Sequence, residues 1–168
     1  MINYRQLALA DHLVVPNQVK RHVMNINTTV HRLQTGEGID LINLDEAVED
    51  AIKESGIKDG MVIVSSRHTT TALAINEYEE RLLIDIRNYF EKIAPPGDRY
   101  LHNDIHLRDC PDDEPENAHS HLLAMLLSSS EVVPIVEGEL QMGQWQSMIL
   151  FELDGPRHRT VNIQVMGE

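Results

Sequence analysis

The chain has 168 residues, of which 42% are hydrophobic, 24% charged and 4% aromatic, and its formal net charge is −13. This length and composition indicate one globular domain whose core relies on aliphatic side chains. The negative charge argues against nucleic acid or an anionic membrane surface as a partner. A single cysteine and the lack of any long apolar stretch exclude an intrachain disulfide and a transmembrane helix, so we expect a cytoplasmic protein.

The N-terminal part of the chain shows two kinds of pattern. Residues 1–20 are weakly patterned, so we expect an N-terminal arm followed by one domain over residues 21–168. From residue 21 to residue 30, polar and apolar side chains alternate, which predicts a half-buried strand. Residues 39–42 form a second short apolar piece after a glycine-containing turn.

A first helix is predicted after this piece. Asn43 stands three residues before Glu46, which is the spacing of a capping box. Apolar side chains from Leu44 to Ile52 then recur at helical spacing, and Gly56 is placed to end the helix with a left-handed cap.

Polar side chains gather where the next strand ends. Residues 61–64 form an apolar run that leads into a cluster of hydroxyl groups with Arg67 and His68, and a second short strand ends on Asn76 and Glu77. Scaffolds often present reactive side chains from the ends of rigid strands. The alternative is an edge strand whose Ser and Thr residues only form local hydrogen bonds.

The middle of the chain is helical on either side of a long loop. The pattern predicts a helix over residues 79–94, which prolines then stop, and a polar loop over residues 98–116. Residues 117–128 predict a third helix. Its buried stripe is expected to consist of Leu122, Met125 and Leu126.

The C-terminal part is rich in β-strand signals, at residues 132–136, 144–153 and 160–165. The last two are expected to pair as a hairpin across the turn at residues 154–156. Strands at both ends and helices in the middle predict an α+β fold.

Three histidines from separate elements are candidates for a metal site: His68, His102 and His121. Three imidazoles with an open position describe a catalytic zinc-type centre. His119 and His121 are two residues apart on a helix and cannot face the same ion, whereas Asn117 and His121 share a face. The alternative is that these are surface histidines that bind nothing.

Other candidates also have two interpretations. Glu77 is either a general base or a carboxylate that complements the start of the following helix. Arg157 and Arg159 leave the same face of a strand, where they either grip a phosphate or form cross-strand salt bridges. Trp145 is interpreted as a core residue rather than a stacking platform.

Five motifs in the same order resemble one family. They are Arg67-His68-Thr69-Thr70-Thr71-Ala72 through Ile75-Asn76-Glu77, Tyr100-Leu101-His102-Asn103-Asp104, Glu116-Asn117-Ala118 with His121-Leu122, Gly138 to Gln146, and Glu152 through Asp154-Gly155-Pro156-Arg157-His158-Arg159. From about residue 21 onward the chain is similar to the YjbQ-like, or secondary thiamine-phosphate synthase, family. It departs from the family pattern at Ser128-Ser129-Ser130, where a glycine is usual.

The resemblance implies an α+β protomer with a β-sandwich-like core and about three helices that assembles as a homotrimer. It implies catalytic roles for His68, Glu77, Asn117, His121 and Arg157. It also implies substrate contacts from Arg67, Thr70, Asn76, Trp145, Gln146 and Arg159, and a divalent metal, Zn or Mg, on His68, His102 and His121.

The activity implied is the joining of a pyrimidine pyrophosphate to a thiazole phosphate with release of pyrophosphate, so the expected partner is a small phosphorylated metabolite. Two alternatives remain open. One is a hydrolase in which the three histidines hold Zn²⁺ and Glu77 activates its water. The other is a trimer that binds a metal or metabolite without catalysis.

Overall fold

The structure is a computed structural model that describes residues 23–168, so the predicted arm over residues 1–20 lies outside the described residues. The α+β fold with three helices is confirmed within this range. In chain order the elements are β1 (Asn25–Gln34), β2 (Gly38–Asn43), α1 (Asp45–Ser55), β3 (Gly60–Ser66), β4 (Thr71–Asn76), α2 (Glu80–Ile93), the short 3₁₀ helices η1 (Leu101–Asn103) and η2 (Ile105–Leu107), α3 (Ala118–Ala124), β5 (Ser130–Val136), β6 (Glu139–Leu140), β7 (Ser147–Gly155) and β8 (His158–Gly167).

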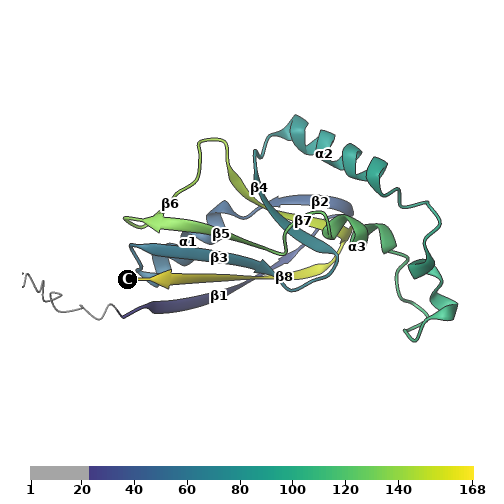
Figure 1. Ribbon diagram of the computed structural model, residues 1–168, viewed down its shortest axis with the longest axis horizontal. Coiled ribbons are helices and arrows are strands. Elements are labelled where there is room, and N and C mark those ends of the chain that lie inside the picture. The colour runs from purple at the N-terminus through teal and green to yellow at the C-terminus, as the bar shows by residue number, and fades with distance from the viewer. Residues whose placement is uncertain (1–22) are drawn as a thin grey trace, which may run out of the picture.

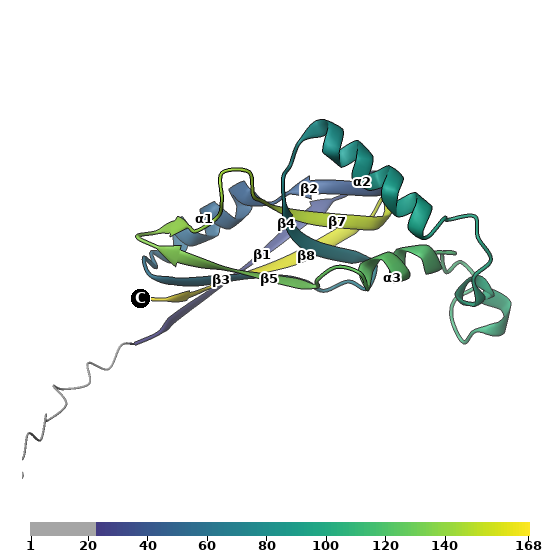
Figure 2. The ribbon, with the colours of Figure 1, turned by 45° about the horizontal axis from the view of Figure 1, so that its top comes forward.

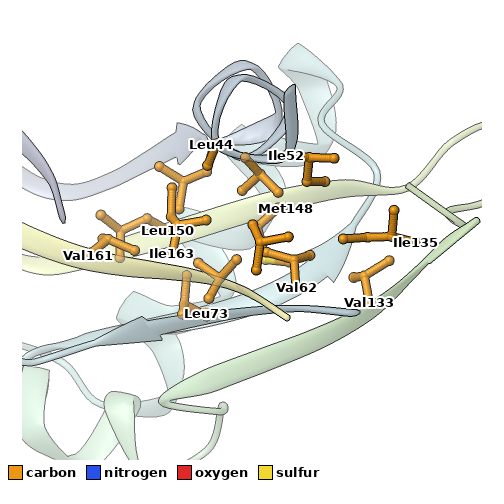
Figure 3. Packing of buried hydrophobic residues seen from close by; sticks show 14 of the residues in the cluster. Leu44, Ile52, Val62, Leu73, Val133, Ile135, Met148, Leu150, Val161 and Ile163 are labelled. Carbon is orange, nitrogen blue, oxygen red and sulfur yellow. The ribbon is translucent and has the colours of Figure 1, made fainter. Parts of the chain in front are cut away.

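The strands form two antiparallel sheets that pack face to face (Figure 1). The larger sheet has five strands in the order β1-β8-β3-β5-β6, and the smaller has three in the order β2-β7-β4. Aliphatic side chains from both sheets and from α1 fill the space between them, as Figure 3 shows for Leu44, Val62, Leu150 and Ile163. This aliphatic cluster is the main core of the protein.

The smaller sheet is buried on both of its faces. Its second face packs against α2 and α3 through Leu83, Phe90 and Leu123 (Figure 2). A strand covered on both faces is expected to be apolar throughout rather than alternating. The central strand β7 follows this rule, because residues 148–153 are all buried, and Glu152 is the one charged residue among them.

The predicted hairpin between the last two strands is wrong. β7 pairs with β2 and β4 in the smaller sheet, whereas β8 pairs with β1 and β3 in the larger sheet. The turn therefore carries the chain from one sheet to the other. Backbones approach closely at this turn, because a Cβ atom on Gly155 would lie 1.9 Å from the carbonyl oxygen of Gly36.

The first helix begins without the predicted capping box. Leu44 is the N-cap residue of α1, and the Oδ1 atom of Asn43 accepts a hydrogen bond from the backbone N–H of Asp45 at 2.7 Å. The side chain of Leu44 is buried in the core, and this burial holds the backbone in place where α1 begins. The predicted end is confirmed, since Gly56 has a left-handed φ of 70°.

Two predictions of buried apolar side chains are wrong. In and after α3, Leu122, Met125 and Leu126 are 45%, 80% and 59% exposed, and the buried side chain is Leu123. Only one side of this short helix packs on the smaller sheet, and that side carries Leu123. Trp145, expected in the core, is 67% exposed in the turn before β7.

The outer face of the larger sheet is open along its centre, and no helix among residues 23–168 covers it (Figure 2). Cross-strand pairs define what we call the neutral face: Ile26, Thr28, Val30, Met61, Ile63, Val132, Pro134, Asn162, Gln164 and Met166. None of these ten residues is charged, and the charged side chains of Arg32 and Glu139 lie on the same side of the sheet toward its margins, paired with Thr160 and Val136. None of the helices within residues 23–168 has the length and apolarity that spanning a membrane requires.

Candidate functional site

The candidate site lies at the corner where the chain passes repeatedly between the two sheets. Three connections make this passage: β1 to β2, β3 to β4, and β7 to β8. They are bonded to one another, because Thr35 N–H donates to the carbonyl of Arg157 at 2.9 Å and Leu153 N–H donates to the carbonyl of Thr70 at 3.1 Å. The corner thus brings together segments that are far apart in the sequence.

A buried ion pair occupies this corner. Arg159 on β8 donates to Glu152 on β7 through Nε at 2.5 Å and through Nη2 at 2.6 Å. Glu152 is fully buried and Arg159 is 7% exposed. Burial alone would raise the pKa of Glu152, but the bonds from Arg159 and from Asp154 N–H lower it below its ordinary value.

The hydroxyl groups of two threonines complete this ion pair. The Oγ1 atom of Thr35 donates to Glu152 at 3.0 Å, and the Oγ1 atom of Thr70 accepts from Nη2 of Arg159 at 2.8 Å. A buried charge pair is tolerated when its remaining bonding capacity is satisfied in this way. The guanidinium of Arg159 therefore bonds within the protein.

A second network joins β7 to the start of α3. Asp154 accepts from Nη2 of Arg157 at 2.9 Å and from Nδ2 of Asn117 at 2.8 Å. Nε of Arg157 also donates to the backbone carbonyl of Asp154 at 3.1 Å. Asn117 and Arg157, which were predicted as catalytic residues, are thus held by the same carboxylate.

His68 lies on the connection from β3 to β4. Its Nε2 atom accepts a hydrogen bond from the backbone N–H of Thr160 at 2.9 Å. A neutral imidazole that accepts at Nε2 carries its proton on Nδ1. Burial lowers the pKa of His68, and the charges of Arg159 and Arg67 lower it further, so the neutral form is favoured.

The imidazole rings of His102 and His121 contact each other edge to face, with their centroids 4.8 Å apart. They line a surface groove of about 290 Å³ together with Tyr100, Leu101 and Leu122. Burial lowers the pKa of His121, and the neighbouring His102 adds to this effect. The 98–116 loop, which carries His102, is tied to α3 because Ala118 N–H donates to Oδ1 of Asn103 at 3.1 Å.

Of the three predicted metal ligands, His102 and His121 are the two that lie in contact among the described residues. Within residues 23–168, no group of three or more His, Cys, Asp or Glu side chains is arranged to hold a metal ion. His68 uses Nε2 as an acceptor and carries a proton on Nδ1, so it offers no free lone pair in this arrangement. The residues present do not form a complete site for a divalent ion, and metal binding stays a prediction.

Two buried polar atoms near α3 lack a hydrogen-bond partner among the described residues: Oδ1 of Asn117 and Nδ1 of His119. Buried polar atoms are normally bonded, so each such atom indicates a strained, hydrated or ligand-binding position. Asn117 adjoins His121 and Asp154 in this network, which adds a free acceptor to the corner.

The remaining predicted residues lie elsewhere. Asn76 ends β4 and is paired with Ser147, so it is separated from Thr71 at the corner by the strand's length, roughly 17 Å. Glu77 follows it and is exposed, while Trp145 and Gln146 precede β7 at this same far end. Gln146 bonds locally, accepting from Gly143 N–H at 2.7 Å. One chain therefore carries two separate groups of predicted residues.

Glu152 and Thr35 are central to the corner, but pattern and spacing assigned neither of them a role. The position of Glu152 carried a usable signal, because a carboxylate inside a continuous apolar run requires a buried cationic partner. Thr35 carried no such signal, since its contact with Arg157 depends on two connections that meet only in the folded chain.

The fold and the site together define an α+β protein of two packed sheets with a polar corner built from sheet crossings. A family model described as UPF0047 protein YjbQ-like matches residues 29–168, and the chain belongs to this family. Curated relatives include a UPF0047 protein of Methanothermobacter thermautotrophicus, 39% identical over 86% of this chain and 95% of its own length. Another UPF0047 protein, from Archaeoglobus fulgidus, is 39% identical over 80% of this chain and 97% of its own.

Solved structures agree with this assignment. A YbjQ-like protein of unknown function from Sulfolobus solfataricus is 33% identical, covers 87% of this chain and 100% of its own, and superposes with a TM-score of 0.78. A protein of the same family from Clostridium acetobutylicum is 32% identical, covers 82% of this chain and 98% of its own, and gives a TM-score of 0.73. These similarities establish the family and the fold.

Proposed function

We propose that the protein is a secondary thiamine-phosphate synthase, which joins a hydroxymethylpyrimidine pyrophosphate to a thiazole phosphate. The thiazole nitrogen would use its lone pair to form a C–N bond to the methylene carbon of the pyrimidine. The C–O bond from that carbon to pyrophosphate would break, and its electron pair would leave with the pyrophosphate oxygen.

One observation carries this proposal: His68, Arg157 and Arg159 lie at the corner of a chain whose net charge is −13. Burial is the main cause of the lowered pKa of both His68 and His121. Arg159 and Arg67 also lower the pKa of His68 while Glu152 raises it, and His102 and Arg108 lower the pKa of His121 while Asp154 and Glu114 raise it. The cationic groups beside the two rings supply local attraction for a polyanionic substrate within a chain of negative net charge.

The roles follow from the position of each group. His68 and His121 are suited to donate hydrogen bonds to a leaving pyrophosphate, because charge that develops in a transition state is stabilised by preorganised donors. Asn117 and Arg157 share Asp154 and would orient the substrate. Glu77, which lies beyond the far end of β4, has no role in this scheme.

We also propose that the protein acts as a homotrimer. A chain of this charge repels its own copies, so a contact between copies requires a surface without charge. The neutral face is such a surface, and it leaves Ile26, Met61 and Val132 between 41% and 60% exposed. Uncovered apolar area of this kind marks interaction surfaces.

A metal-dependent hydrolase is the second candidate, and the contact between His102 and His121 is the observation that favours it. Two imidazoles supply part of the ligand set of a catalytic Zn²⁺, and the protein would need further ligands to complete it. A trimer that binds a metal or metabolite without turnover is the outcome expected if neither reaction is found.

The decisive experiment measures thiamine-phosphate formation from the two phosphorylated precursors by purified protein. We expect His68→Ala and His121→Ala each to lower kcat by about a hundredfold or more, the range for loss of a preorganised hydrogen-bond donor to developing charge. His106→Ala, which removes an exposed histidine of the same loop region, is the matched control and should keep the activity. Activity that survives both site variants would overturn the proposal.

A further inference from the structure

Three arginines lie at or beside the corner, and their guanidinium groups differ in what they bond. Arg159 is committed to Glu152 and Thr70, and Arg157 directs Nε and Nη2 to Asp154. Arg67 is exposed, and among residues 23–168 its guanidinium has no hydrogen bond and no ion pair. The free guanidinium of this set therefore belongs to Arg67.

The neighbouring residue offers a second free donor. Because Nε2 of His68 accepts from Thr160 N–H, the proton of the neutral ring is on Nδ1, and Nδ1 has no partner among the described residues. Arg67 is the adjacent residue in the chain, and its charge is among those that lower the pKa of His68. A guanidinium fork beside an N–H donor suits a phosphate or pyrophosphate oxygen.

The connection that carries these two residues is fixed at both ends. At one end, the hydroxyl of Ser66 accepts from His68 N–H at 3.3 Å and contacts the hydroxyl of Thr71. At the other end, Thr70 is held through its hydroxyl by Arg159 and through its carbonyl by Leu153 N–H. The buried Glu152–Arg159 pair therefore holds one end of this connection in place, through the bond from Arg159 to Thr70.

We propose that Arg67 and His68 bind an oxyanion of a phosphorylated ligand and that the Glu152–Arg159 pair positions their loop. This deepens the proposed function, on which it rests for the identity of the ligand. It moves the main phosphate contact away from Arg157 and Arg159, which the sequence had suggested, to the residue whose charge is uncompensated. Arg159 and Glu152 are positioning residues, since they reach the ligand only through Thr70 and the loop.

The test uses the full chain and inorganic pyrophosphate as the probe, with ¹⁵N-labelled histidine followed by NMR. We expect pyrophosphate to shift the His68 ring resonances and Arg67→Ala to weaken its binding by about tenfold to a hundredfold, as for a lost bond to a charged group. Arg67→Lys should recover part of the affinity. Arg81→Ala, which removes an exposed arginine on α2, is the matched control and should bind like the wild type.

The positioning role has its own variant. Thr70→Val removes the acceptor that links Arg159 to the loop and leaves the Glu152–Arg159 pair in place. We expect weaker pyrophosphate binding, an altered His68 resonance and a melting temperature lowered by only a few degrees, because one buried N–H loses its acceptor while the ion pair stays. Equal binding by Thr70→Val and wild type would remove the positioning role.

The remaining outcomes separate this inference from the proposed function. Equal pyrophosphate binding by Arg67→Ala and Arg81→Ala, or a free-state NMR signature with the His68 proton on Nε2, would overturn the oxyanion site whatever the turnover. Pyrophosphate binding that depends on Arg67 in a protein that forms no thiamine phosphate would support the oxyanion site and reject the synthase.

Discussion

Glu152 and Arg159 connect the two sheets at their shared corner, one from the middle of the smaller sheet and one from the larger. Their two hydrogen bonds, of 2.5 and 2.6 Å, are buried inside the protein. They are seven positions apart in the chain, and the crossing from β7 to β8 brings them face to face. Around this pair, β1, β4 and the loop of His68 are all held in place.

Glu152→Gln should strongly destabilise the fold, because it leaves the guanidinium of Arg159 buried without its counter-charge. Removing one partner of a buried pair costs about 3–5 kcal/mol of unfolding free energy, measured by urea denaturation. Asp50→Asn, in the exposed pair of Asp50 and Lys53 at 3.7 Å, is the control and should cost less than about 1 kcal/mol. Equal losses in the two variants would show that the buried pair adds nothing.

Stability should fall as the pH is lowered from about 7.5 to 5.5. Burial lowers the pKa values of His68, His119 and His121 in the folded state. The unfolded chain, with ordinary values near about 6.5, then binds protons that the folded chain does not, so acid favours unfolding. Below this range the lowered pKa of Glu152 acts in the same direction.

The measurement for this pH dependence is the free energy of unfolding by urea at each pH. The free energy of unfolding of His119→Asn should decline less with falling pH than that of the wild type. The difference between the two proteins at pH 8 is subtracted at every pH. A stability that rises toward pH 5.5 would contradict the assignment of neutral, buried imidazoles.

Leu123→Ala and Leu122→Ala should separate sharply although the residues are adjacent. Leu123 is fully buried against the smaller sheet, so its truncation should cost about 2–5 kcal/mol of unfolding free energy. Leu122 is 45% exposed, and its truncation should cost less than about 1 kcal/mol. Thermal or urea unfolding of both variants decides this, and similar costs would mean that the side of α3 facing the sheet is wrongly assigned.

Met61→Glu should disrupt the proposed homotrimer, because it places a charge on β3, the middle strand of the neutral face, where copies of the chain are proposed to meet. Light scattering at micromolar concentration should report a trimer for the wild type and smaller species for the variant. Ile84→Glu, at an exposed position of α2, is the control and should leave the assembly intact. A wild-type protein that is a monomer under these conditions refutes the trimer.

His121→Ala should abolish uptake of the divalent ion that the family resemblance implies, because His121 and His102 are predicted ligands that lie in contact. The metal content is measured by elemental analysis after dialysis against a metal-free buffer, and His106→Ala serves as the control. A wild-type protein with no bound divalent ion after loading with zinc or magnesium would show that the predicted metal site is wrong.

The helices and most strands were predictable because each depends on a local pattern. Leu44 to Ile52 repeats at helical spacing and Gly56 ends the helix, and both features appear in α1. The partners of the strands were not predictable, because β7 and β8 have turn residues between them like those of a hairpin and yet belong to different sheets. Local turn chemistry does not tell which sheet a strand will join.

The candidate site was predicted in part for the same reason. His68 and Arg67 stand out because polar groups follow an apolar strand. The attachment of His68 to β8 and of Asn117 to β7 depends on hydrogen bonds that only the folded chain forms. Asn76 and Trp145, which belong to motifs of the same family, lie far from this corner, where β4 ends and β7 begins.

The order of amino acids by itself determined the secondary structure, the charge and the family, because propensity, periodicity and motif spacing act within a few residues of each other. Only the tertiary structure decided which charges are neutralised. Glu152 cancels Arg159 and Asp154 pairs with Arg157, whereas Arg67 remains unpaired among the described residues. Coulomb energy depends on distance through space, and those distances exist only after the two sheets have packed together.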